Sequence, residues 1–281
     1  MIPTSFGYFR PTTLDEAIHL LAQNEDAKVL AGGHSLLPAM KLRLAQPKTI
    51  IDLGRVAELN YIREEGGQIA IGAMTTHFEI ESSKLLREKC PLLPEVAEHI
   101  GDVQVRNKGT FGGSLVHADP AADWPAAALA LDVEFEIAGP NGRRMVRAQD
   151  FFVEIMQSAV QANEILSEIR LPATGKCVAY AKFAQKASGF AIAGVAVAID
   201  RNNREARIGI TGIAAKAYRA SAVENELRGK TLTAEAIRSA SAQAADGIDP
   251  LNDIHASGEF RAHLARVHCE RALTQAAERI S

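Results

Sequence analysis

The sequence predicts an α+β fold divided into two domains, and three observations support this prediction. The chain has 281 residues, whereas a single domain typically has roughly 150. Hydrophobic residues make up 47% of the chain and charged residues 23%, a composition that is typical of globular proteins and excludes long disorder, collagen and coiled coils. In the last third of the chain the strand-like segments precede the helical ones, which favours an antiparallel sheet covered by helices.

The N-terminal part of the chain predicts a small β-α-β unit. Thr13 and Glu16 have the spacing of a capping box, and apolar residues follow them at helical intervals. A short strand over residues 28–31 comes next, and a second helix begins near Ser35. A strand over residues 49–53 closes the unit.

The middle of the chain alternates short strands with helical patterns. Residues 65–67 and 140–142 are turn signals, and each joins two strand-like segments into a hairpin. Helical patterns cover residues 75–100 and 124–131, and the stretch between them is rich in glycine. A further strand is predicted over residues 165–171. The two hairpins are expected to pair residues 60–63 with 68–71 and residues 133–137 with 143–146.

Residues 172–175, Pro-Ala-Thr-Gly, are the best candidate for a domain boundary because they contain two strong turn formers. After them the sequence predicts three strands, with a turn over residues 201–203 between the last two. These strands are expected over residues 178–184, 192–199 and 206–213. Three helices follow, over residues 220–227, 234–245 and 258–280, and the last carries apolar residues on one face.

Charge, aromatic content and cysteine spacing exclude several classes of function. The net charge is −3 and aromatic residues make up 5% of the chain, so neither a nucleic acid nor an anionic membrane is an expected partner. The three cysteines, Cys90, Cys177 and Cys269, form no CxxC pair and indicate a reducing compartment. They cannot supply the four thiolates of an ordinary iron–sulfur cluster. A redox cofactor in this chain is therefore expected to be organic.

The apolar runs of the chain predict a soluble protein. The first ten residues have neither the basic nor the apolar region of a secretion signal. The best apolar run, residues 124–131, is far shorter than the ~20 residues that cross a bilayer. We therefore expect a cytoplasmic protein, which a complex could also place peripherally at the inner face of the membrane.

Two glycine-rich segments carry the strongest functional signal. The first is Ala31-Gly-Gly-His-Ser-Leu36, between a strand and a helix, and the second is Gly109-Thr-Phe-Gly-Gly-Ser114. Consecutive glycines allow successive backbone N–H groups to point at one anion, and Ser35 and Ser114 add hydroxyl groups. Either segment alone is typical of a tight turn before a helix. Together they match the two phosphates of a dinucleotide.

Other motifs are absent or incomplete. No GxGxxG follows the first strand, so a Rossmann site is not supported. Residues 229–231, Gly-Lys-Thr, resemble the end of a Walker loop, but Glu224 stands where that loop needs glycine. No HExxH motif indicates zinc. His117 and Asp119 suggest a metal site or an acid–base pair, but a polar loop is the favoured interpretation because no partner ligand accompanies them.

With its two glycine segments the chain resembles the flavin-binding medium subunits of molybdenum hydroxylases, in particular those of the aerobic carbon monoxide dehydrogenase type. The resemblance rests on AGGHSLLPAMKLRLAQP, residues 31–47, and GTFGGSLVHADPAAD, residues 109–123. Together these two segments are highly specific for the family. The resemblance covers nearly the whole chain and includes residues 2–11, 62–66, 71–77, 164–170 and 227–230.

The resemblance implies a fold and a domain division. Such subunits bind FAD without covalent attachment, in a domain of the vanillyl-alcohol oxidase or PCMH type with two α/β subdomains. A C-terminal α+β domain with an antiparallel sheet and three helices completes the subunit. Carried over to this chain, the FAD-binding domain is residues 1–174, with subdomains of about 1–55 and 56–174, and the C-terminal domain is residues 175–281.

The resemblance also implies which residues contact the diphosphate of FAD. The first glycine segment is expected to hold it from one side, through Ala31, Gly32, Gly33, His34, Ser35 and Leu36. The second is expected to approach from the other side, through Thr110, Gly112, Gly113 and Ser114. No catalytic residue and no metal ligand is expected in this chain.

Four further residues are implied near the flavin part of the cofactor. Asp123 is expected to make a polar contact with it, and Ile100, Leu166 and Lys182 match positions beside the ring. An ammonium group at Lys182 would stabilise negative charge on the reduced flavin and raise its potential. The alternative for Lys182 is a surface lysine on a strand. His77 is explained by the start of a helix and is not counted among the site residues.

By resemblance, the chain is an electron-transfer subunit of an oxidoreductase. Electrons from a molybdenum centre pass through two-iron two-sulfur clusters on a small subunit to FAD on this chain, and then to an external acceptor. The expected partners are that small subunit and a large molybdopterin subunit, in a dimer of heterotrimers. Phe111 and residues 117–120 and 188–190 depart from the family pattern and leave the oxidised substrate open.

Two other hypotheses remain open at this point. A self-sufficient flavin oxidoreductase would need its own base near the flavin, and His117 and Asp119 are the candidates. A cofactor-free scaffold that joins two partners would need neither glycine segment.

Overall fold

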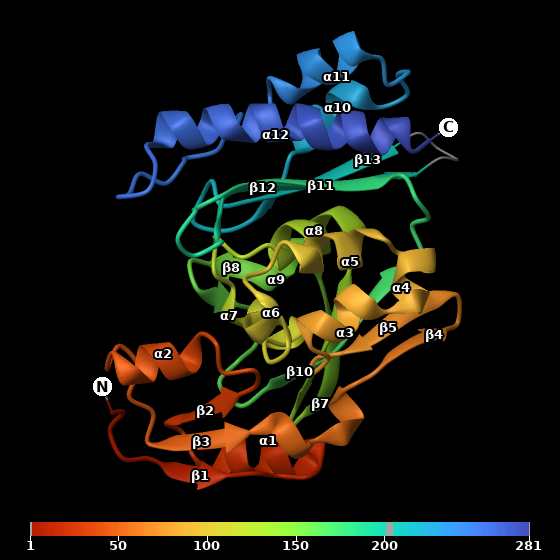
Figure 1. Ribbon diagram of the computed structural model, residues 1–281. Helices are drawn as coiled ribbons and strands as arrows, with labels where there is room; N and C mark the ends of the chain where they lie inside the picture. Colours follow the sequence, from red (N-terminus) through yellow and green to blue (C-terminus); the bar gives the residue numbers. More distant parts are fainter. Residues whose placement is uncertain (1, 201–204, 281) are drawn as a thin grey trace.

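The computed structural model describes residues 2–200 and 205–280, which form three units stacked on one another (Figure 1). The N-terminal unit, red and orange in Figure 1, lies at one end of the molecule, and the C-terminal helices, in blue, lie at the other. The turn expected over residues 201–203 lies outside the described residues. No helix within the two described ranges is long and apolar enough to cross a membrane.

The N-terminal unit is a parallel three-stranded sheet with the strand order β1-β3-β2. The predicted start of its first helix is confirmed, because the Thr13 side chain accepts a hydrogen bond from the Glu16 backbone N–H. The Glu16 carboxylate bonds the Thr12 N–H instead of completing the capping box. The sequence did not predict β1, whose residues are all exposed and show no apolar alternation. The elements are β1 (Gly7–Phe9), α1 (Leu14–Gln23), β2 (Ala27–Leu30), α2 (Leu36–Lys41), β3 (Thr49–Asp52) and the 3-10 turns η1 (Leu53–Arg55) and η2 (Ala57–Leu59).

The middle unit is built on an antiparallel sheet with the strand order β4-β5-β10-β6-β7. Both predicted hairpins are confirmed, since β4 pairs with β5 and β6 pairs with β7. A bulge interrupts the pairing of β10 with β6 between Leu166 and Glu168. The strands are β4 (Ile62–Glu65), β5 (Gln68–Gly72), β6 (Glu134–Gly139), β7 (Gly142–Arg147) and β10 (Ile165–Pro172). A separate hairpin of β8 (Phe152–Glu154) and β9 (Gln157–Ser158), which the sequence did not predict, lies between α9 and β10 in the sequence.

Seven short helices belong to the described part of the middle unit. The helical pattern over residues 75–100 forms three of them, because Ser83 caps a new helix and Pro91 begins another. Two helices lie in the glycine-rich stretch, where the sequence predicted none, since glycine lowers helix propensity. The helices are α3 (His77–Ser82), α4 (Lys84–Lys89), α5 (Leu92–Glu98), α6 (Val103–Arg106), α7 (Phe111–His117), α8 (Trp124–Leu131) and α9 (Ala148–Phe151).

The C-terminal unit is an antiparallel sheet covered by helices, as the order of its segments predicted. Helix α12 packs along β11 and β12, α10 packs against β13, and α11 contacts both of these helices. The strands are β11 (Val178–Ala184), β12 (Ala191–Asp200), β13 (Glu205–Thr211) and β14 (Tyr218–Arg219). The helices are α10 (Ser221–Leu227), α11 (Ala234–Ser241) and α12 (Gly258–Glu278).

Helix α8 joins the middle and C-terminal units. It packs against β12 and β13 from the face of the sheet opposite α12, and all eight of its residues are buried. A helix that is covered on every side is apolar all round, which accounts for its Trp-Pro-Ala-Ala-Ala-Leu-Ala-Leu sequence. The close approach requires a glycine, because a Cβ on Gly209 of β13 would lie 2.0 Å from the Ala126 carbonyl oxygen.

Candidate functional site

The two glycine segments, residues 31–36 and 109–114, meet in the folded chain. A Cβ on Gly32 would lie 2.3 Å from the Lys108 carbonyl oxygen and 2.7 Å from the Cα of Gly109. A Cβ on Gly113 would lie 3.1 Å from the Cβ of Ala31. The N-terminal and middle units therefore touch through their glycine segments. Close contact of two backbones that are far apart in sequence is what a shared binding site requires.

The first glycine segment presents a row of unused backbone donors. It connects β2 to α2, and Gly33 has a φ of +79°, in the left-handed region that favours glycine. Within the described residues, no backbone N–H of residues 32–36 donates to a protein acceptor, and the Ser35 hydroxyl does not cap α2. His34 and Ser35 are exposed. Successive N–H groups on an accessible bend form a site for an anionic group.

The second glycine segment, unlike the first, does not present free backbone N–H groups. Its N–H groups are used internally: Phe111 donates to the Thr75 carbonyl (2.8 Å) and Gly112 to the Ala73 carbonyl (2.9 Å). The Gly113 N–H donates to the Thr110 hydroxyl (3.2 Å), which caps α7. The expectation that both segments offer rows of free N–H groups is therefore wrong for the second. Its glycines permit close packing instead.

Asp123 and Lys182 form a buried ion pair between the middle and C-terminal units. The Lys182 ammonium lies 2.8 Å from Asp123 Oδ1 and donates to the His99 carbonyl oxygen at 2.9 Å. The Tyr180 hydroxyl donates to the same Asp123 oxygen at 2.5 Å. The two charged side chains are only 3% and 6% exposed, so Lys182 is not a surface lysine. Burial raises the pKa of Asp123, and the charge of Lys182 opposes that shift.

Ile100 and Leu166 lie in the apolar interior of the middle unit. Leu166 is buried in β10, next to the bulge, and Ile100 packs against the same core just after α5. The loop between β11 and β12 approaches there, because a Cβ on Gly189 would lie 3.8 Å from the Cα of Gly101. Of the residues expected near the flavin, Ile100, Asp123 and Lys182 therefore lie near the junction of the middle and C-terminal units, whereas Leu166 belongs to the core of the middle unit.

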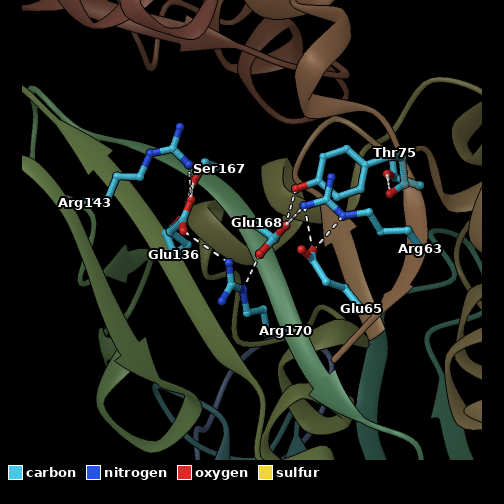
Figure 2. A network of polar contacts seen from close by, with 9 residues as sticks. Arg63, Glu65, Thr75, Glu136, Arg143, Ser167, Glu168 and Arg170 are labelled. Atoms are coloured by element: carbon cyan, nitrogen blue, oxygen red, sulfur yellow. Dashed lines mark hydrogen bonds and ion pairs between the residues drawn. The ribbon is translucent and has the colours of Figure 1, made fainter. Parts of the chain in front are cut away.

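A polar network on the sheet holds the bulge beside Leu166 (Figure 2). Glu168 is buried and accepts hydrogen bonds from Tyr61, Arg170 and Arg63, the last at 3.2 Å. The Ser167 hydroxyl donates to the Glu136 backbone carbonyl at 2.9 Å. Burial alone would raise the pKa of Glu168, but Tyr61 and Arg170 outweigh it and lower that pKa. These bonds fix the backbone of β10 where the sequence placed a cofactor contact.

His77 is the residue of this region that the sequence interpretation undervalued. It is the first residue of α3, as expected, but its ring is buried and accepts a hydrogen bond at Nδ1 from the Trp124 indole at 3.1 Å. Burial lowers its pKa to about 3. The signal in the sequence was the Thr-Thr-His of residues 75–77, but nothing local connects it to Trp124.

His117 is helical, whereas Asp119 lies in the loop that follows α7. The Asp119 carboxylate accepts a hydrogen bond from the Ala121 N–H at 2.8 Å, and His117 lies in the last turn of α7. In the described ranges, no three His, Cys, Asp or Glu side chains are arranged to hold a metal ion. The three cysteines are buried and form no disulfide.

An open groove of about 930 Å³ lies between α5 and α12, beside the Asp123–Lys182 pair. Lys182 and His99 line it together with Arg87 and Arg271. Neither glycine segment contributes to its lining as far as the chain is described.

Comparison with known proteins identifies the family of the chain. Residues 4–174 match the family described as the FAD binding domain in molybdopterin dehydrogenase, and residues 178–276 match the CO dehydrogenase flavoprotein C-terminal domain. The chain is 42% identical to the carbon monoxide dehydrogenase medium chain of Hydrogenophaga pseudoflava, with 98% of each covered. It is 36% identical to the nicotine 6-hydroxylase medium subunit of Paenarthrobacter nicotinovorans, with 97% of each covered.

The solved structures show the same fold over the full length. The carbon monoxide dehydrogenase of Hydrogenophaga pseudoflava that lacks the Mo-pyranopterin moiety of its cofactor contains a chain that aligns with a TM-score of 0.96, at 42% identity and with 100% of each chain covered. The chain therefore belongs to the family of FAD-binding medium subunits of molybdenum hydroxylases, of the carbon monoxide dehydrogenase type.

Proposed function

We propose that this flavoprotein subunit holds FAD across its two glycine segments and passes electrons from iron–sulfur clusters on a partner subunit to an external acceptor. The observation that carries the proposal is the contact of Gly32 with Gly109, next to a row of unused N–H groups over residues 32–36. Bound FAD would supply the redox chemistry.

The first glycine segment is the better fit to the diphosphate. Its free N–H groups can donate to phosphate oxygens without losing a protein partner. On the other side, Gly113 brings the start of α7 against Ala31 of the first segment, while Thr110 caps α7 and Gly112 packs on Ala73. The Ser114 hydroxyl has no acceptor or donor among the described residues. In this arrangement one segment supplies most of the hydrogen bonds and the other closes the site.

At the flavin end, the Asp123–Lys182 pair sets the electrostatics. Because the carboxylate and the ammonium are 2.8 Å apart, their charges largely cancel. Lys182 therefore raises the flavin potential less than an unpaired ammonium would. Leu166 and Ile100 supply the apolar surface on which the ring is expected to pack.

The chain works within a larger complex. Its relatives are named as medium chains or subunits of dehydrogenases and hydroxylases, and all three of its own cysteines are buried. We propose a small two-iron two-sulfur subunit and a large molybdopterin subunit as partners, in a dimer of heterotrimers within the cytoplasm. We also propose a division at residues 174/175, with the FAD-binding domain before it and the C-terminal domain after it. The large subunit selects the substrate.

Purification of the full chain tests the proposal. It should take up one FAD, turn yellow and stay inert toward simple alcohols and aldehydes until the partner subunits are added. A chain that binds no FAD, alone or within its complex, would contradict the proposal and favour a scaffold. Turnover by the chain alone would favour a self-sufficient oxidoreductase.

A further inference from the structure

Residues 73–77, here called the platform, carry the second glycine segment. The backbone carbonyls of Ala73 and Thr75 accept the hydrogen bonds of Gly112 and Phe111, and the His77 N–H donates to the Gly109 carbonyl at 2.9 Å. The platform follows β5 directly, so the central sheet of the middle unit positions it. The second glycine segment is thus fastened along its length to one short stretch of chain.

The His77 side chain is fixed in one neutral form. Its ring is 4% exposed, and the Trp124 indole N–H donates to Nδ1 at 3.1 Å. An imidazole that accepts at Nδ1 and is not protonated carries its proton on Nε2. Trp124 is itself fully buried and packs edge-on against Phe111, with ring centroids 4.7 Å apart. The indole therefore determines both the tautomer and the orientation of the ring.

The other edge of this ring lies against Gly109. A Cβ on Gly109 would meet His77 Nε2 at 2.6 Å and Cδ2 at 2.8 Å, and the Val105 carbonyl oxygen at 3.1 Å. Gly109 is also the residue that Gly32 contacts, because a Cβ added to Gly32 would lie 2.7 Å from the Gly109 Cα. Trp124, His77, Gly109 and Gly32 form one continuous row of contacts.

We propose that His77 is a positioning residue for the FAD site: its ring, oriented by Trp124, sets the place of Gly109 and thereby the spacing of the two glycine segments. The inference rests on the proposed function and adds a residue that neither glycine segment contains. His77 does not move a proton in this role. Its contribution is to hold the second glycine segment at the distance from the first at which both segments can contact one diphosphate.

A matched set of variants tests the role of His77. His77→Asn keeps an acceptor for the Trp124 indole but removes the ring edge over Gly109. His77→Phe keeps the ring volume but removes the acceptor. Gly109→Ala adds the methyl group that the ring excludes, at a position where the backbone φ is not left-handed. Each variant and both combinations with Gly109→Ala are titrated with FAD as full-length chains, and their thermal stability is followed in parallel.

The expected result is a rescue. Gly109→Ala should weaken FAD binding about tenfold or more, the size of coupling measured between contacting residues. His77→Asn should restore most of this loss in the double variant, because it removes the two nearest atoms that the added methyl group meets, whereas His77→Phe should not. If Gly109→Ala binds FAD as the wild type does, or if His77→Asn fails to rescue it, the proposal is wrong.

A second readout does not depend on the cofactor. Trp124 is the only tryptophan of the chain, so its indole N–H gives a single resolved NMR signal. That signal should keep its hydrogen-bonded shift in His77→Asn and lose it in His77→Phe. An unchanged signal in His77→Phe contradicts the assigned tautomer. A wild-type chain that binds no FAD contradicts the proposed function, whereas binding without rescue contradicts only the role of His77.

Discussion

At the scale of single residues, the glycines of the site serve two different purposes. Gly33 adopts a left-handed φ of +79°, which turns the first segment so that its N–H groups stay free. Gly32, Gly109 and Gly112 instead permit close contact, since a Cβ on any of them would lie within 2.7 Å of a neighbouring atom. The sequence predicted that these positions matter and that the segments converge. It could not separate the two purposes, because Gly-Gly looks the same in both segments.

Substitution of Gly33 should remove FAD binding without a general loss of fold. Gly33→Ala forces a side chain onto a left-handed residue and places its Cβ 2.9 Å from Leu37 Cδ1. The matched control is Gly67→Ala, which has the same φ of +79° but open space around it, in the β4–β5 turn. Both variants should lose about 1–2 kcal/mol of stability from backbone strain, but only Gly33→Ala should fail an FAD titration. Equal FAD affinity in the two variants would refute the role of the first segment.

The buried neutral His77 should make the protein less stable in mild acid. Burial lowers its pKa from 6.5 to about 3, so below pH 6.5 the unfolded chain binds a proton that the folded chain does not. The free energy of unfolding should fall by about 1.4 kcal/mol for each pH unit in this window on account of His77. Urea denaturation at pH 8 and pH 5 measures it.

His77→Asn is the control for this pH dependence. The variant retains His268, whose pKa burial lowers to about 4. It therefore loses only the contribution of His77 to the pH dependence of stability. Between pH 8 and pH 5 the variant should lose about 2 kcal/mol less stability than the wild type. An identical pH dependence in both proteins would show that His77 is not held neutral.

At the scale of elements, the sequence predicted most strands and long helices but missed short ones. The turn signals at residues 65–67 and 140–142 identified the two hairpins because glycine and asparagine mark such turns directly. Strand β1 was missed since it is three exposed residues long. Helix α7 was missed because its first turn is Phe-Gly-Gly, and its stability comes from the Thr110 cap and from tertiary packing against the platform, β9, β10 and α8.

The complete burial of helix α8 follows from the tertiary structure, because the helix lies between the middle unit and the C-terminal sheet. Its close packing on β13 leads to a prediction about stability. Gly209→Ala should destabilise the protein by about 1–3 kcal/mol, the usual effect of overpacking, because its Cβ would lie 2.0 Å from the Ala126 carbonyl oxygen. Arg207→Ala on the same strand is the control and should change stability by less than about 0.5 kcal/mol. Urea denaturation compares the two, and equal effects would mean that α8 does not approach β13 this closely.

At the scale of the whole molecule, a buried ion pair joins the C-terminal unit to the middle unit. The sequence placed Asp123 and Lys182 near the flavin by resemblance, but their mutual contact joins residues from two units and follows from no local pattern. Tyr180 and the His99 carbonyl were not foreseen either, because each is recognisable only by its distance to the pair. The ion pair is thus part of the proposed flavin site, and it also holds the middle and C-terminal units together.

Removal of one partner of this pair should cost more than removal of both. Lys182→Met leaves a buried carboxylate without its counter-charge and should lose about 3–5 kcal/mol of stability at pH 8. The double variant Asp123→Asn with Lys182→Met should recover most of that loss. Because burial raises the pKa of Asp123, the carboxyl of Lys182→Met can become neutral in acid, and its deficit should shrink as the pH falls. Additive losses in urea denaturation would contradict a coupled pair.

The most direct test of the account is a crystal structure of the chain, or of its complex, with FAD bound. We predict diphosphate oxygens within hydrogen-bond distance of the backbone nitrogens of residues 32–35, with the Ser114 hydroxyl facing them from α7. Cofactor bound anywhere that leaves the donors of the first glycine segment unused would contradict it.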